Sequence, residues 1–202
     1  IPEILSYPMK TTYFPTPPEE YPNIFEASKD IAFAMGSAPV VGSLLKTLVA
    51  SKPRGRFLEI GTGTGLATCW LTDGMDPKSQ LISLDNDPKV LSIAQKTFQK
   101  DSRVAFHCTD AAQWLNNYKG APFDLIFADA WPGKFSHLDQ TLGLLKTAGF
   151  YIIDDLLPQD NWPKGHQEKV NDLIHFLHHK KDFVTSQLDE ATGVMIMVKT
   201  GL

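Results

Sequence analysis

The turn Glu59-Ile60-Gly61-Thr62-Gly63-Thr64-Gly65 joins two segments of contrasting character. The residues before it, from Arg56, have the short apolar pattern of a strand, and Ala67-Thr68-Cys69-Trp70-Leu71 after it favours a helix. Three glycines at alternate positions let the backbone turn sharply and lie close to a ligand, because no side chain blocks the approach. The next predicted strand ends in Asp85, whose carboxylate can accept both hydroxyls of a ribose. Together the turn and this acid predict a nucleoside-binding site in an α/β sheet.

The composition is that of one globular domain. The chain has 202 residues, of which 43% are apolar and 21% are charged, and its formal charge is −4. This acidic balance argues against a general nucleic-acid binder, and no apolar stretch or secretory pattern directs the chain to a membrane, so we expect a cytoplasmic protein. Two cysteines, Cys69 and Cys108, are too few for a disulfide framework and lack zinc-site spacing. Both are predicted to be buried small side chains.

The first 22 residues form a segment of their own. Six prolines exclude regular structure there, so we expect an extended N-terminal arm over residues 1–22 and a single domain over 23–202. The arm also carries apolar rings that should pack on the domain or on a second subunit: Tyr7, Tyr13, Phe14 and Tyr21. Two helices are predicted next, over 23–35 and over 37–50, the second with Ser37 as N-cap and Pro39 in its first turn.

Strands and helices then alternate. Strands are predicted over 56–60, 80–85, 103–107, 123–128 and 149–154, and helices start near Gly65, Asp87, Ala111, Lys134 and Pro163. The last helix has one apolar face, made of Val170, Leu173, Ile174 and Leu177, and the runs 182–188 and 193–199 form a terminal hairpin. This order predicts an α/β fold with a doubly wound, mostly parallel sheet and one antiparallel strand.

Each predicted parallel strand ends in an acid. Ligands of such sheets gather at the carboxyl ends of the strands, so these acids are candidates for binding or catalysis. Asp is also common at turns and helix starts, and Asp110 is a natural N-cap. The candidates for cofactor binding are Glu59, Gly61, Thr62, Gly63, Gly65, Asp85, Asn86, Asp110, Ala111 and Asp129.

The turn resembles motif I of the class I S-adenosylmethionine-dependent methyltransferases, which reads Glu-x-Gly-x-Gly-x-Gly. The dinucleotide fingerprint of dehydrogenases has a different spacing, G-x-G-x-x-G. Glu59 also suits a cofactor with a positive sulfur and an ammonium better than a pyrophosphate. The resemblance implies S-adenosylmethionine as cofactor and a Rossmann-like, seven-stranded sheet with strand order 3-2-1-4-5-7-6.

Two later stretches resemble the catechol and caffeoyl-CoA O-methyltransferase group. Residues 123–130 read Phe-Asp-Leu-Ile-Phe-Ala-Asp-Ala, and residues 149–155 read Gly-Phe-Tyr-Ile-Ile-Asp-Asp. Residues 36–45 are similar to a helix that borders the cofactor pocket in that group. The resemblance implies O-methylation of a small hydroxylated, aromatic acceptor, in a protein whose N-terminal segment closes the acceptor pocket or contacts a second subunit of a homodimer.

The same group holds Mg²⁺ or another divalent cation on acids after its fourth and fifth strands. Carried over by position, the metal ligands would be Asp129, Asp154 and Asp155, although the group has Asn where Asp155 stands. The group's catalytic lysine position is Pro132 here, which leaves Lys134 and His137 as candidate bases beside Asp129.

Two other functions stay open. A similar catalytic half could methylate a hydroxylated tRNA base, although the acidic balance counts against it. The displaced lysine also allows a cofactor-binding protein without transferase activity. The acceptor itself is not encoded in any general motif.

Overall fold

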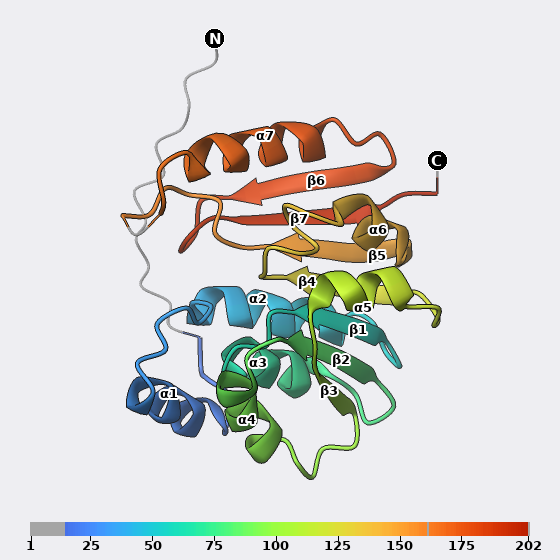
Figure 1. Cartoon of the computed structure of the whole chain (residues 1–202). Helices are drawn as coiled ribbons and strands as arrows, with labels where there is room; N and C mark the ends of the chain where they lie inside the picture. The colour runs from blue at the N-terminus through green and yellow to red at the C-terminus, as the bar shows by residue number, and fades with distance from the viewer. Residues whose placement is uncertain (1–14, 161, 202) are drawn as a thin grey trace.

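A single twisted sheet of seven strands forms the centre of the protein. The computed structural model describes residues 15–160 and 162–201. The strand order is β3-β2-β1-β4-β5-β7-β6, which confirms the expected α/β topology; in Figure 1 it runs from β3 low in the view to β6 near the top. The strands are β1 (Arg56–Ile60), β2 (Gln80–Asp85), β3 (Val104–Cys108), β4 (Phe123–Ala128), β5 (Leu145–Ile153), β6 (Phe183–Leu188) and β7 (Val194–Lys199).

The register of the strands determines where a site can form. β1 pairs in parallel with β2 on one side and with β4 on the other, and β4 pairs in parallel with β5. Only β7 among the described strands runs against its neighbours, β5 and β6. The carboxyl ends of β1, β2, β4 and β5 therefore meet at one edge of the sheet.

Helices cover both faces of the sheet. Val41 and Leu45 of α2 and Leu71 of α3 pack on one face, whereas Leu115 of α5 and Val170 of α7 pack on the other. Helix α1 lies outside α3, where the ring of Tyr21 contacts Trp70 at 6.0 Å between centroids. The helices are α1 (Tyr21–Asp30), α2 (Pro39–Ala50), α3 (Leu66–Gly74), α4 (Pro88–Thr97), α5 (Ala111–Asn117), α6 (Leu138–Gly143) and α7 (His166–His178).

The helix starts that carry a capping acid are the ones predicted best. The Asp87 carboxylate accepts from the Lys89 amide at 2.8 Å and thereby caps α4, which begins at the predicted proline. Asp110 caps α5 by accepting from the Gln113 amide at 2.8 Å. On α7, Val170, Leu173 and Leu177 are buried as expected, and Ile174 packs beside them.

Several predicted boundaries are wrong for local reasons. Helix α1 ends at Asp30 instead of residue 35, because Ala32 adopts a left-handed conformation with φ 55°. The N-cap of α2 is Ala38 and not Ser37. Helix α6 starts at Leu138 rather than Lys134, and α7 starts at His166 rather than Pro163.

Two further corrections concern strands and a cysteine. β5 starts four residues early, at Leu145, and tolerates a register shift against β4 where Ala148 has φ 61°. β3 is displaced by one residue, so it ends with Cys108. Cys69 is buried as predicted, but Cys108 is exposed, because β3 is the edge strand.

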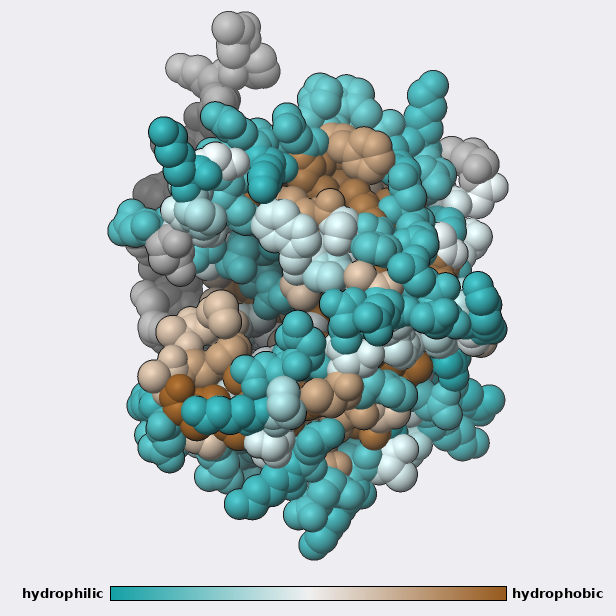
Figure 2. All heavy atoms as spheres, viewed as in Figure 1, coloured by the Kyte–Doolittle hydropathy of each residue, from teal (hydrophilic) through white to brown (hydrophobic). Residues whose placement is uncertain are grey.

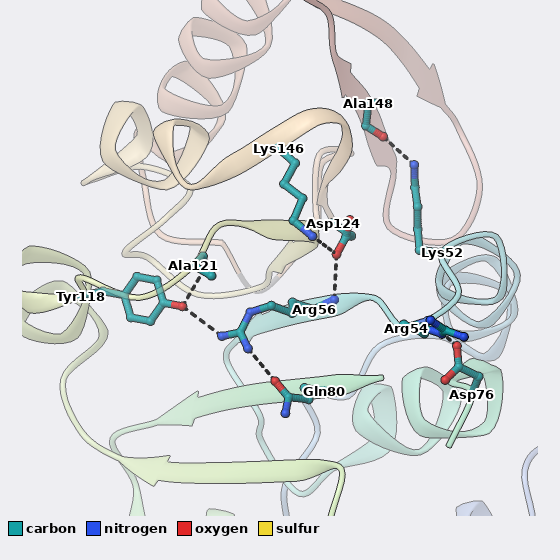
Figure 3. A network of polar contacts seen from close by, with 10 residues as sticks. All are labelled: Lys52, Arg54, Arg56, Asp76, Gln80, Tyr118, Ala121, Asp124, Lys146 and Ala148. Atoms are coloured by element: carbon teal, nitrogen blue, oxygen red, sulfur yellow. Dashed lines mark hydrogen bonds and ion pairs between the residues drawn. The ribbon is translucent and has the colours of Figure 1, made fainter. Parts of the chain in front are cut away.

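A polar network ties together the amino ends of the strands, opposite to the edge described above (Figure 3). Asp124 of β4 accepts from the Arg56 amide of β1 at 2.8 Å and from Lys146 Nζ of β5 at 2.7 Å. The Arg56 guanidinium donates to Gln80 of β2 at 2.5 Å and to the Tyr118 hydroxyl at 3.3 Å. Four elements are thus fixed at one end, which leaves the other end for a ligand.

Hydrophilic side chains predominate on the face seen in Figure 2, where a hydrophobic patch lies near α7. No helix in the described parts of the chain is both long enough and apolar enough to cross a bilayer. Of the predicted arm, residues 1–14, including Tyr7, Tyr13 and Phe14, lie outside the described residues, and its last two residues belong to α1. The arm and domain boundaries stay a prediction.

Candidate active site

The glycine-rich turn after β1 is held between the ends of β2 and β4. The amides of Gly61 and Thr62 both donate to the Leu84 carbonyl, at 2.9 and 3.0 Å. Gly61 has φ 100°, and a Cβ on it would lie 2.5 Å from the Asp129 carbonyl oxygen. Gly63 has φ 56° and faces the ring of Phe33. Only glycine fits this path, which brings the backbone close to the sheet edge.

Asp85 organises the turn at the end of β2. Its Oδ2 accepts from the Gly63 amide at 2.7 Å, and its Oδ1 accepts from the Asp87 amide at 2.9 Å. The carboxylate is half-buried, and each oxygen has lone pairs left for a ligand. Asp85 is therefore both part of the turn and a group that can bind sugar hydroxyls.

A cavity of about 500 Å³ opens at this edge, between the turn and the ends of β2, β3 and β4. This volume suits a small-molecule cofactor. Eight of the ten predicted cofactor residues line it: Gly61, Thr62, Gly63, Asp85, Asn86, Asp110, Ala111 and Asp129. The two that do not line it are Glu59, which is fully buried, and Gly65, which faces Ala94 of α4.

Glu59 is fully buried and supports the turn from below. Its Oε2 accepts from the hydroxyls of Thr68 at 2.6 Å and Ser83 at 2.5 Å, while Oε1 has no partner among the described residues. Burial raises the pKa of Glu59 to about 8, against the lowering effect of the two hydroxyls. Cofactor binding by Glu59 stays a prediction, and its place outside the cavity lining gives no support to a direct contact.

Asp129 follows β4 and is the acid placed best for chemistry. It lies half-buried in the cavity wall, its amide donates to the Ile60 carbonyl at 2.8 Å, and Ser37 Oγ donates to Oδ2 at 3.4 Å. Burial raises the pKa of Asp129 to about 7, and the positive charge of Lys134 opposes this rise. The carboxylate can accept a proton or a hydrogen bond from a ligand in the cavity.

The two acids after β5 are engaged within the protein. Asp154 is 2% exposed, and its Oδ1 accepts from Thr192 Oγ1 at 2.7 Å and from the Asp155 amide at 2.8 Å. Asp155 Oδ1 accepts from Gln159 Nε2 at 2.8 Å. Burial raises the pKa of Asp154. Neither residue lines the cavity that holds Asp129.

These positions do not fit the predicted divalent site. Among residues 15–160 and 162–201, no three His, Cys, Asp or Glu side chains lie where they could hold one ion. Metal ligation by Asp129, Asp154 and Asp155 therefore stays a prediction to which this arrangement gives no support.

The candidate bases Lys134 and His137 do not line the cofactor-sized cavity. Lys134 is 4% exposed, and its Nζ donates to the backbone carbonyl of Asp154. His137 is the N-cap residue before α6 and has φ 57°, and its Nε2 lies 3.4 Å from the Asn116 amide nitrogen. Both border a second cavity, of about 620 Å³, between α6 and α7.

An aromatic cluster beside the site was not predicted. Trp131 is 48% exposed and lines both cavities. Its ring lies 4.7 Å from that of Phe135 and 6.0 Å from that of His166, which also contacts Trp162 at 4.6 Å. The sequence indicated this cluster only through the two aromatic residues of the loop, Trp131 and Phe135. Another member, His166 of α7, lies more than 30 positions further along the chain, so its contact with the loop could not be predicted.

Comparisons with known proteins agree with this geometry. The family described as "Methyltransferase domain" matches residues 57–148. A catechol O-methyltransferase of Mycobacterium tuberculosis is 28% identical over 120 residues, which cover 57% of this chain and 54% of that protein. The chain thus spans little more than half the length of this curated relative.

Solved structures share the fold over nearly the whole chain. The O-methyltransferase TomG from Streptomyces achromogenes, solved with S-adenosylmethionine, has a TM-score of 0.79 at 20% identity and covers 94% of this chain and 93% of its own. An O-methyltransferase from Bacillus cereus, solved with S-adenosylhomocysteine, has a TM-score of 0.79 at 21% identity, with 92% of each chain covered. The chain thus matches the methyltransferase domain family over residues 57–148, and its matched sequence and its fold are similar to those of O-methyltransferases.

Proposed function

We propose that the chain is one methyltransferase domain, over residues 23–202, that uses S-adenosylmethionine to methylate an oxygen of a small hydroxylated aromatic molecule. The observation that carries this proposal is the cavity lined by the glycine turn, Asp85 and Asp129. The turn and Asp85 bind the nucleoside part of the cofactor, and Asp129, at the end of β4, is the acid nearest to where an acceptor would enter.

When bound, S-adenosylmethionine supplies an electrophilic methyl group on a positively charged sulfur. The protein holds the acceptor oxygen in line with that methyl group and excludes water, which is most of the catalysis such a reaction needs. Asp129 is the carboxylate in the cavity lining that can accept the proton released by the acceptor hydroxyl. Ser37 orients the Asp129 carboxylate through the contact at 3.4 Å.

The exposed ring of Trp131 supports an aromatic acceptor. It lies next to Asp129 in the chain, lines the same cavity and is backed by the ring of Phe135. A planar acceptor that packs on this ring would present its hydroxyl near Asp129. The acidic balance of the chain gives no support to a tRNA acceptor.

Calorimetric titration tests the cofactor part of this proposal. S-adenosylhomocysteine should bind and NAD should not. Asp85→Ala should weaken binding by about 1.5–3 kcal/mol, the range for a hydrogen bond to a charged group. Asp139→Asn is the matched control, because this exposed acid lies on α6 and not in the cofactor cavity. Tighter binding of NAD would overturn the proposal.

Turnover on a panel of hydroxylated aromatic compounds tests the transfer itself. Asp129→Asn should lower kcat by about 10²–10⁴, the usual contribution of a general base, while S-adenosylhomocysteine affinity changes little. Binding of the cofactor without turnover on any acceptor would instead favour a cofactor-binding protein without transferase activity.

A further inference from the structure

β6 is one of the two edge strands of the sheet, and it lacks the features that usually protect an edge. Among the described strands it pairs only with β7 (Figure 1), and the register of the two is unbroken from Phe183 to Leu188, so the edge carries no bulge. Its sequence, Phe-Val-Thr-Ser-Gln-Leu, contains no charge and no proline. Edge strands of natural proteins use bulges, charges and proline to prevent pairing with another chain. The edge of β6 is therefore open to a further strand.

The hydrogen bonds between β6 and β7 determine which backbone groups point outward. The Thr200 amide, just after β7, donates to the Asp182 carbonyl, just before β6, at 2.8 Å. This direction alternates along an antiparallel strand, so the backbone groups of Thr185 and Gln187 point away from β7. They bond to no other described residue. The open edge thus carries free donors and acceptors at alternate residues.

Two apolar side chains of β6 are exposed beside these groups. Helix α7 packs on the face of the strand that carries Phe183. The opposite face carries Val184 and Leu188, which are 64% and 37% exposed. A neighbouring strand would remove part of this apolar surface from water, which is favourable.

Charged side chains of opposite sign lie at the two ends of β6. Lys181 precedes the strand, and Asp189 and Glu190 follow it. All three are exposed, and none forms an ion pair with another described residue. A strand that is positive before its start and negative after its end is complementary to a copy of itself that runs antiparallel. The partner that fits this edge is therefore a second copy of the chain.

The other edge strand, β3, offers no such complementarity. Arg103, which precedes it, is already paired with Asp101 at 2.6 Å, and Asp110, which follows it, caps α5. Two copies of β3 would thus form no new charge pair, so the charges favour β6.

We propose that β6 pairs with β6 of a second copy, antiparallel and about a twofold axis, so that the two sheets become continuous. An axis normal to the sheet keeps the exposed faces of both copies on the same side. With this axis at Thr185, the Thr185 amide donates to the carbonyl of its counterpart and its carbonyl accepts in return. No residue of β6 lines the cofactor-sized cavity, so the inference does not rest on the proposed function.

The charges distinguish this register from the neighbouring one. With the axis at Thr185, Lys181 lies opposite the partner subunit's Asp189, and the same pair forms a second time by symmetry. An axis one residue further along would place Asp182 opposite the partner subunit's Glu190, and like charges directly opposite are destabilising. The register centred on Thr185 is therefore favoured.

Sedimentation equilibrium with charge reversals tests both the pairing and its register. Two paired six-residue strands make a small interface, so the wild type should dimerise with a dissociation constant on the order of 10 μM. Lys181→Glu and Asp189→Lys should each weaken the dimer about tenfold, because each places like charges opposite at two symmetric positions. The double variant restores opposite charges and should return to within about threefold of the wild type.

General charge repulsion would give a different pattern. The formal charge of the chain is −4, so Lys181→Glu would weaken and Asp189→Lys would strengthen any non-specific association. Lys119→Glu is the matched control, because this exposed lysine precedes β4 in the middle of the sheet and should leave the dimer unchanged. Thermal melts show that each variant is folded.

Amide exchange of the wild type supplies a second measurement that needs no variant. Exchange of the Thr185 amide, followed by nuclear magnetic resonance, should slow at least about fivefold from low to high protein concentration, because the amide gains a carbonyl partner. Exchange of the β3 amides, at the other edge, should not depend on concentration.

Three results would overturn the inference: a wild type that stays monomeric up to about 500 μM, tighter association of Asp189→Lys, or a double variant that dimerises no better than the single ones. A dimer that ignores these charges and is lost on deletion of residues 1–14 would assign the contact to the N-terminal segment and would also overturn it.

Discussion

Replacing Glu59 by Gln should change how the stability of the protein depends on pH. Glu59 is fully buried under the glycine turn, where it accepts from Thr68 and Ser83, and burial raises its pKa to about 8. The ordinary value for this side chain is 4.5. The folded protein therefore holds a proton on Glu59 over a pH range in which the unfolded chain has released it.

The sign and size of the effect follow from this difference. Below pH 4.5 both states are protonated, so Glu59 costs the protein nothing. As the pH rises to about 8, the unfolded chain binds fewer protons than the folded protein, and the free energy of unfolding falls. At about 1.4 kcal/mol for each pH unit, the wild type loses on the order of 5 kcal/mol over this interval. That loss is a large fraction of the stability of a typical domain.

Gln cannot ionise, so Glu59→Gln should escape this loss. Its amide nitrogen replaces the unpartnered Oε1 and should cost about 1–3 kcal/mol at every pH, as an unsatisfied buried polar group does. The variant should thus be less stable than the wild type at pH 5, should gain on it up to about pH 8, and should keep that gain at higher pH.

Urea unfolding of both proteins between pH 5 and 9 measures the difference. Glu190→Gln is the control, because this residue lies exposed in the turn between β6 and β7, and its curve should stay parallel to that of the wild type. A constant difference between Glu59→Gln and the wild type across this range would refute the reasoning, since it would mean that Glu59 ionises alike in both states.

Three other changes have definite expected results. Gly61→Ala places a methyl group 2.5 Å from a backbone oxygen and should weaken S-adenosylhomocysteine binding at least about tenfold by calorimetry, whereas Gly143→Ala, with open space around it, should not. Trp131→Ala should raise the KM for an aromatic acceptor about tenfold in steady-state kinetics and leave cofactor affinity nearly unchanged. Deleting residues 1–22 should lower the melting temperature about 2–8 °C further than deleting 1–14, because it removes the start of α1 and its aromatic contact with α3.

The strands of the sheet were predictable because each of them carries a local sequence signal. The apolar runs of β1, β2 and β4 are short, buried on both faces and bounded by turn residues, and such runs depend little on distant contacts. Helices α4 and α5 were located closely because Asp87 and Asp110 cap them locally. The resemblance to a known family then supplied the order of the strands.

The boundaries that failed depend on distant contacts instead. Helix α6 starts late because residues 131–136 form a loop that the Tyr151 hydroxyl and the Trp131 carbonyl hold in place. β5 starts early because its first residues pair with Phe123 of β4 across a register shift. Local sequence propensity does not reveal either contact, because both depend on tertiary packing, which overrides propensity.

The acids at the strand ends show why a pattern alone does not assign roles. Five acids were predicted as site residues because each lies at the carboxyl end of a predicted parallel strand. In the structure, the surroundings of each acid differ. Glu59 is buried beneath the turn, Asp110 caps a helix, and Asp154 is engaged by Thr192. Asp85 and Asp129 line the cavity together with Asp110.

Charge balance explains how so many acids can share one edge of the sheet. Ionised carboxylates at close range repel one another, and a fold must neutralise, protonate or separate them. Burial raises the pKa of Glu59, Asp129 and Asp154 and so favours their protonated forms, whereas helix and turn amides bind the carboxylates of Asp85 and Asp110.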